Sequence, residues 1–228
     1  MAKILQIESA TAVCSVALSV DGITLAVKEE QGQNLHASRL TLFIEELLNS
    51  CQMKFNELDA ISVSKGPGSY TGLRIGVSTA KGLAYALGIP LIAVETLKMM
   101  AAGFVFENPD FSGLVCPMID ARRMEVYTAL FKSSIENILP TAAEIIDDTS
   151  FKNLLSTNSI VFLGDGAAKC EAAIQDQNAT FSLDNFNSAK YMSALSFEAF
   201  QQKDFVDVAY FEPFYLKDFV VTQPKKKV

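Results

Sequence analysis

The predicted order of strands and helices constrains the fold of this chain more than any other feature. Short apolar runs near the N-terminus indicate strands, Asp21-Gly22 is a typical hairpin turn, and an apolar period of three and four residues then indicates a helix. The elements are expected to be the strands Lys3–Glu8, Val13–Val20 and Ile23–Glu29, a helix with Asn34 as N-cap whose apolar period runs from Leu40 to Cys51, the strand Ile61–Ser64, the helix Thr71–Leu87 and the strand Leu91–Val94.

The second half of the chain repeats this order more weakly. Val115–Asp120 is a predicted strand that ends in a carboxylate, as the first strand ends in Glu8. Such repetition predicts an α/β protein with two related lobes, residues 1–102 and 103–228, whose last residues could pack back on the first lobe. Two mixed sheets flanked by helices form the ribonuclease H-like layout of the actin and sugar-kinase superfamily, the ASKHA fold. The lobe boundary is expected near Met99–Phe111. In the second lobe we expect the rest of a meander at Met124–Phe131 and Asn137–Glu144, the strand Ile160–Leu163 and a second glycine turn at Gly164–Gly166. The expected helices are Phe151–Leu155, Ala167–Gln175 and Ser188–Phe200, and Pro213–Asp218 closes the chain.

Charge and cysteine spacing exclude several classes of protein. A net charge of −7 argues against autonomous RNA binding, which needs a basic face, and Lys225–Lys227 is expected to be a solvated tail. Cys14, Cys51, Cys116 and Cys170 form no CxxC pair and are expected to be free thiols in a reduced cytoplasm. Neither a secretory signal nor a bilayer-spanning apolar stretch is present, so we expect a cytoplasmic protein that does not associate with membranes.

The segment Lys65–Gly76 is the strongest candidate for a functional element. Its glycines permit a sharp turn before a helix whose N-terminus could attract an anion, although a purely structural turn is the simpler interpretation. The following helix carries small residues at four-residue steps, and each interior glycine there costs about 1 kcal/mol relative to alanine. This small-residue strip either packs on the protein's own sheet or lines a subunit interface, and the sequence leaves both open. The strip consists of Gly72, Gly76, Ala80, Ala84 and Gly88.

Few residues of the chain could support catalysis. His36 is the only histidine, so a histidine-based metal site is excluded and an ordinary hydrogen bond is expected of it. Glu8 and Asp120 end the first strand of each lobe, where carboxylates of this superfamily commonly meet phosphate-bound magnesium. However, the loop Ser9–Val13 has no glycine that would admit a phosphate. We therefore predict no catalytic residue and no metal site. The candidates for contacting a nucleotide are Glu8, Thr11, Gly68 and Ser69.

Several segments of the chain resemble the TsaB (YeaZ) family. The resemblance is dense over residues 1–130 and sparse afterwards, with Glu8 where the family commonly has Asp and Tyr70 where it commonly has Phe. The segments are Ile4–Thr11, Leu35–Leu40, Lys65–Gly76, Pro90–Val94 and Asp120–Tyr127.

The resemblance implies a paralogue of the catalytic subunit TsaD that lacks its metal-binding histidines. It implies a non-catalytic partner that binds and activates TsaD, alongside the ATPase TsaE, for threonylcarbamoyl transfer to the adenosine next to the anticodon of certain tRNAs. The chain would form a homodimer when alone, would meet tRNA only through the complex and would hold no cofactor tightly, although ATP or ADP could lie at the partner interface. That interface would include Leu35, Arg39, Leu42, Phe43, Gly72, Arg74, Gly76, Ala80 and Ala84.

Two other functions are compatible with parts of this pattern. An autonomous ATP-binding kinase or ATPase would use the same fold, with Glu8 near the nucleotide. A peptidase, which older names of the family suggest, is opposed by the missing metal ligands. The sequence does not decide between a homodimer and a heterodimer.

Overall fold

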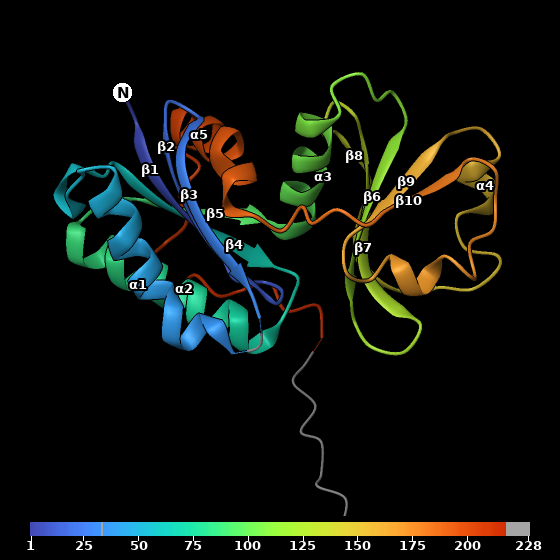
Figure 1. Cartoon of the computed structure of the whole chain (residues 1–228), viewed down its shortest axis with the longest axis horizontal. Helices are drawn as coiled ribbons and strands as arrows, with labels where there is room; N and C mark the ends of the chain where they lie inside the picture. The colour runs from blue at the N-terminus through green and yellow to red at the C-terminus, as the bar shows by residue number, and fades with distance from the viewer. Residues whose placement is uncertain (33, 218–228) are drawn as a thin grey trace, which may run out of the picture.

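The computed structural model describes residues 1–32 and 34–217, which form two five-stranded mixed sheets with a helix between them (Figure 1). In the first sheet, β1 pairs antiparallel with β2 and parallel with β4. In the second, β6 pairs in the same way with β7 and β9. The first sheet has the order β3 (Ile23–Gln31), β2 (Val13–Val20), β1 (Lys3–Glu8), β4 (Ala60–Gly66), β5 (Leu91–Glu95), and the second β10 (Ala179–Ser182), β9 (Ile160–Leu163), β6 (Leu114–Asp120), β7 (Glu125–Lys132), β8 (Asn137–Ile145).

Helices cover both faces of the first sheet. Helices α1 (Leu35–Ser50) and α2 (Tyr70–Leu87) lie together on one face, and α5 (Ser193–Gln202) lies on the other (Figure 1). Because side chains alternate along a strand, Leu5 packs toward α1 and α2 while Ile4 belongs to the core on the opposite face. The predicted apolar face of α1 is buried in this structure, and full burial of one such side chain stabilises the fold by about 1.5–3 kcal/mol.

Helix α3 (Thr96–Glu107) joins the two sheets. We expected a lobe boundary near Met99–Phe111, and most of that range belongs to α3, which ends at Glu107. Most side chains of α3 are buried, because one apolar cluster contains Met100 and Phe104 of the helix together with residues of both sheets. A helix that is buried on most sides has no polar face and therefore no clear amphipathic period.

The second lobe departs most from the sequence expectations. The predicted helix Ala167–Gln175 is only a short 3-10 turn, Ala168–Cys170, and the strand β10 was not predicted. Over the predicted helix Ser188–Phe200 the chain forms a 3-10 turn, Ala189–Met192, followed by α5. A short helix α4 (Lys152–Leu155) follows β8. Across residues 1–32 and 34–217, no helix combines the length and apolar character that crossing a bilayer requires.

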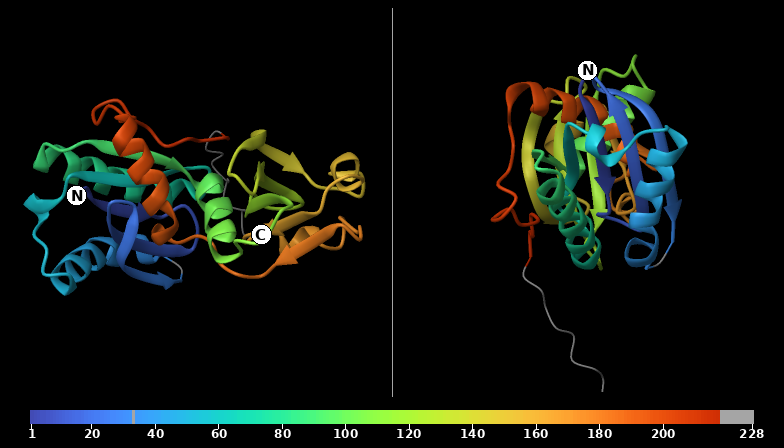
Figure 2. Two further views of the ribbon diagram at one scale, coloured as in Figure 1. Left: turned by 90° about the horizontal axis from the view of Figure 1, so that it is seen from above. Right: turned by 90° about the vertical axis from the view of Figure 1, so that its left-hand side faces the viewer.

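After α5 the chain returns to the first lobe. The Val206 N–H donates to the Leu91 carbonyl of β5 at 2.9 Å, and Val208 and Phe211 pack against the core beneath α1 and α2. Figure 2 shows this segment in red, running along the first lobe. The predicted tail Lys225–Lys227 and Asp218 lie outside the described residues.

Candidate functional site

Glu8 is the last residue of β1, at the end of the sheet where the parallel strands β4 and β5 also have their carboxyl ends. Its side chain is fully buried, and one carboxylate oxygen accepts a hydrogen bond from the Ala10 N–H at 2.6 Å. Its second oxygen, like the hydroxyls of Ser9 and Ser64, is buried without a hydrogen-bond partner among the described residues. Burial raises the pKa of Glu8 to about 7, although the hydrogen bond from Ala10 opposes the shift.

The loop after Glu8 lies directly against the small-residue strip of α2. The Ser69 N–H donates to the Ala10 carbonyl at 2.6 Å, and the Ser69 hydroxyl caps α2 by accepting from the Gly72 N–H at 3.3 Å. A Cβ at Gly72 would lie 2.1 Å from the Ser9 carbonyl oxygen, and a Cβ at Gly76 would lie 2.0 Å from the Ser9 hydroxyl. These glycines therefore allow α2 to approach the protein's own loop.

The nucleotide candidates come together at this place, and the chain's own atoms fill much of the space around them. Gly68 has no room for a side chain because a Cβ there would lie 2.3 Å from the Ala10 carbonyl oxygen. The Thr11 hydroxyl accepts from the Val13 N–H at 3.3 Å. Because Glu8 is fully buried and the space beside Gly68 and Gly72 is filled, a magnesium-bound nucleotide does not fit this arrangement of residues.

Asp120, the matching carboxylate of the second lobe, is engaged as well. It forms an ion pair with Lys169 and accepts from the Arg122 N–H at 3.0 Å. Although partial burial opposes it, the hydrogen bond from Lys169 lowers the pKa of Asp120. The same ammonium group donates to the Glu125 carbonyl at 2.7 Å. Within residues 1–32 and 34–217, no three or more His, Cys, Asp or Glu side chains gather in a way that could hold a metal ion.

The histidine and the cysteines have structural surroundings. His36 is buried, with Nε2 at 3.1 Å from the Val13 carbonyl oxygen, which confirms the expected ordinary hydrogen bond. The four cysteines are free thiols, as predicted.

The predicted partner residues divide between the surface and the core. Leu42 and Arg74 are exposed, and Leu35 and Arg39 are half-buried. The other predicted partner residues are buried within this chain: Phe43, Gly72, Gly76, Ala80 and Ala84.

On the opposite face of α2, Arg74 alone was predicted as a partner residue. Gly82 has nothing within 4 Å of the place where its Cβ would be, and Tyr85 is 83% exposed. Arg74, Ser78 and Gly82 form a second strip at four-residue steps. Gly82 is the residue that could have indicated this face from the sequence, because a glycine destabilises the helix and no contact within the chain requires one here.

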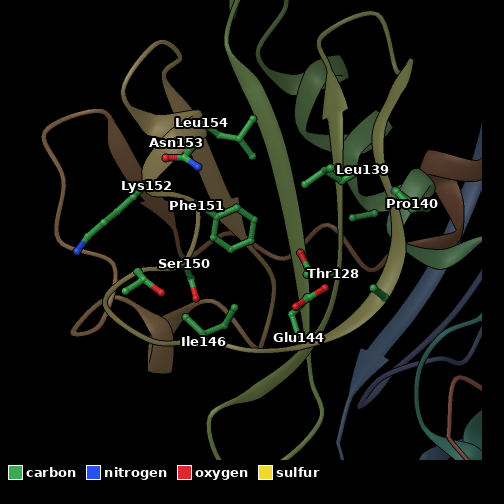
Figure 3. Close-up of a pocket in the computed structure, with 13 residues that line it drawn as sticks. Thr128, Leu139, Pro140, Glu144, Ile146, Ser150, Phe151, Lys152, Asn153 and Leu154 are labelled. Atoms are coloured by element: carbon green, nitrogen blue, oxygen red, sulfur yellow. The ribbon is translucent and has the colours of Figure 1, made fainter.

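A cavity of about 450 Å³ lies in the second lobe, between β8 and the segment Thr149–Leu154 (Figure 3). Its lining includes Leu139, Ile146 and Phe151 and none of the residues predicted for a nucleotide or a partner. The cavity is therefore separate from the two strand-end carboxylates.

Comparisons with known proteins place this arrangement in a family. The family model described as TsaD, tRNA N6-adenosine threonylcarbamoyltransferase, matches residues 27–222. The tRNA threonylcarbamoyladenosine biosynthesis protein TsaB of Bacillus subtilis (strain 168) is 34% identical over 176 residues, which cover 76% of this chain and 75% of that protein. The protein of the same name from Escherichia coli (strain K12) is 38% identical over 130 residues, 57% of this chain and 55% of that protein.

Solved structures agree with the sequence comparisons. A crystal structure of an uncharacterized protein with similarity to peptidase YEAZ from Pseudomonas aeruginosa has a TM-score of 0.84 and 28% identity, covering 95% of this chain and all of that chain (100%). A structure of YeaZ from the same organism has a TM-score of 0.81. The two-lobed α/β fold predicted from the sequence is confirmed. By its sequence and by its fold, this chain belongs to the TsaB (YeaZ) family.

Proposed function

We propose that this chain is a non-catalytic partner subunit in the biosynthesis of threonylcarbamoyladenosine in tRNA. The names of its relatives support the process. The partner role rests on one observation, that the chain itself buries one strand-end carboxylate and pairs the other with a lysine. Glu8 is sealed beneath the loop that contacts α2, and Asp120 is neutralised by Lys169. A phosphate-bound metal needs carboxylate oxygens that it can reach, and the buried Glu8 does not offer them, so this structure favours binding over chemistry.

The partner is a TsaD-type catalytic subunit, and its docking surface is the outward side of α1 and α2. Both helices lie on the same face of the first sheet (Figure 1). Leu42 and Tyr85 are exposed there, and the open Gly82 lets another backbone come close. In this proposal the same surface forms the homodimer of the isolated chain, a TsaE-type ATPase joins the complex, and tRNA is held by the assembly because this chain carries a net charge of −7. The chain acts in the cytoplasm.

The test measures partner binding and tRNA modification with surface variants. We expect Leu42→Glu and Tyr85→Ala to weaken binding to the TsaD-type subunit at least tenfold and to reduce threonylcarbamoylation in a reconstituted assay, because anchors at the centre of an interface carry most of its free energy. Leu183→Ala is the matched control, since Leu183 is 86% exposed on the other lobe.

Two results would contradict the proposal. One is full binding and full modification with both α1–α2 variants while their circular dichroism stays unchanged. The other is magnesium-dependent ATP binding by the isolated chain that is lost in Glu8→Ala, which would indicate an autonomous ATPase instead.

A further inference from the structure

The segment from Asp204 to Lys217, here called the strap, is attached to the rest of the molecule in two different ways. Its first part, residues 204–211, is built into the first lobe. Val206 pairs with Leu91 at the edge of β5, and the Lys81 ammonium of α2 donates to the Phe211 carbonyl at 2.9 Å. Val206 and Phe211 also pack on the apolar core. Removing this part would uncover a sheet edge and apolar surface.

The second part of the strap, residues 212–217, contributes no residue to the three apolar clusters of the described chain. The Phe214 N–H donates to the Lys65 carbonyl at 2.6 Å, and the Tyr215 ring lies 4.9 Å from the Tyr70 ring at the first residue of α2. Lys217 forms an ion pair with Glu125 of the second lobe. Tyr215 as a whole residue is still 37% exposed, and a surface ion pair contributes little in water. Release of this part alone leaves the core intact.

This second part of the strap covers one end of the surface to which the proposed function assigns the partner. The Arg74 guanidinium lies 5.3 Å from the centre of the Tyr70 ring and donates to the Tyr70 hydroxyl at 3.2 Å. Tyr215 therefore contacts the residue on which Arg74 rests. A Cβ at Gly66 would lie 2.8 Å from the Phe214 carbonyl oxygen, so the strap also lies tightly over the turn that precedes α2.

We propose that residues 212–217 are a releasable cover over the amino-terminal end of α2, which a partner displaces when it binds there. Partner binding then breaks the link between Lys217 and Glu125, so that contact on the first lobe changes the second. This inference rests on the proposed function. When only the uncovered fraction of a protein can bind, the apparent affinity falls by that fraction, and loosening the cover restores it.

The experiment compares two loosened variants with a matched control from the same strap. Tyr215→Ala removes the ring contact and Lys217→Glu reverses the ion pair, whereas Tyr210→Ala changes a ring that is 85% exposed. Hydrogen exchange at the Phe214 amide reports release, and calorimetric titration with the TsaD-type subunit of the same organism reports affinity. We expect faster exchange and about threefold to tenfold tighter binding in both loosened variants, with Tyr210→Ala unchanged. Adding Glu125→Lys to Lys217→Glu restores the ion pair. The exchange rate at Phe214 and the affinity for the TsaD-type subunit should then return toward those of the unchanged chain.

The outcomes separate the cover from the proposed function. Faster exchange with unchanged or weaker binding would overturn the cover and make the strap part of the docking surface. Unchanged exchange in both variants would also overturn it, because the contacts would not hold the strap. Absence of binding by the unchanged chain and by every variant would overturn the proposed function, and the cover with it.

Discussion

At the scale of single residues, Glu8 shows that a carboxylate can lie at the usual ligand position of an α/β sheet and still be closed off from solvent. The carboxyl edge of a parallel sheet is where α/β proteins place their ligands. Here the carboxylate at that edge is fully buried, and the Ala10 N–H of the next loop donates to it. A buried carboxyl group without an opposite charge favours its protonated form, and burial therefore raises the pKa of Glu8 to about 7.

The raised pKa of Glu8 predicts a pH dependence of stability. Because burial raises the pKa of Glu8 from 4.5 to about 7, the folded chain binds a proton that the unfolded chain releases. The stabilisation that Glu8 contributes is complete below pH 4.5 and is lost as the pH rises through about 7. The total loss in the free energy of unfolding is about 3 kcal/mol. Glu8→Gln cannot ionise and should remove this fall in the free energy of unfolding. Urea titrations at pH 5 and pH 8 measure it.

The control for this prediction is Glu45→Gln, which changes an exposed carboxylate on α1. It should keep the pH dependence of the unchanged chain. An equal fall between pH 5 and pH 8 in the unchanged chain and in Glu8→Gln would contradict the assignment to Glu8.

At the scale of elements, α2 has two faces with different surroundings. Gly72 and Gly76 face the loop after β1, where a Cβ would overlap the backbone or side chain of Ser9. Gly82 faces outward and has nothing within 4 Å. Substitutions of Gly76 would therefore disturb the fold before they reported on a partner, and the outward side of α2 is the proper place to test binding.

One substitution made at both glycines tests this division. Gly76→Ala should lower the free energy of unfolding by about 1–3 kcal/mol, because the added methyl group has no space beside Ser9. Gly82→Ala should raise it by about 1 kcal/mol, because alanine favours the helix and the site is open. Urea unfolding followed by circular dichroism measures both changes. Shifts of the same sign in the two variants would show that the division is wrong.

At the scale of the whole molecule, a shared core joins the two lobes. The cluster that contains Met100 of α3 also includes Ile4 of the first sheet and Val115 of the second. Figure 1 shows α3 between the two sheets. Burial of one apolar cluster by both lobes favours cooperative unfolding, because neither sheet keeps that core when the other is lost.

A cavity in the shared core should therefore weaken both lobes together. Met100→Ala should cost about 2–5 kcal/mol and accelerate hydrogen exchange in β4 and in β6 alike, because Met100 is fully buried. Phe106→Ala in the same helix is the control, since Phe106 is exposed and its loss should change stability by about 0.5 kcal/mol or less. Faster exchange in only one sheet would contradict a common core.

The sequence by itself determined the local elements of the first lobe, the repeat and the family. Strand alternation, the Asp21-Gly22 turn and the period of α1 are local patterns, so they can be found without knowing what lies opposite. Only the tertiary structure decided which side of α2 is buried, because Gly76 would suit the protein's own loop or a partner's helix equally well until its distance to Ser9 is known. The same holds for α3, whose buried surface leaves no period, and for the strap, whose contacts join residues far apart in the chain. A periodic pattern identifies the face of an element that must be covered, but what covers it depends on contacts between distant segments.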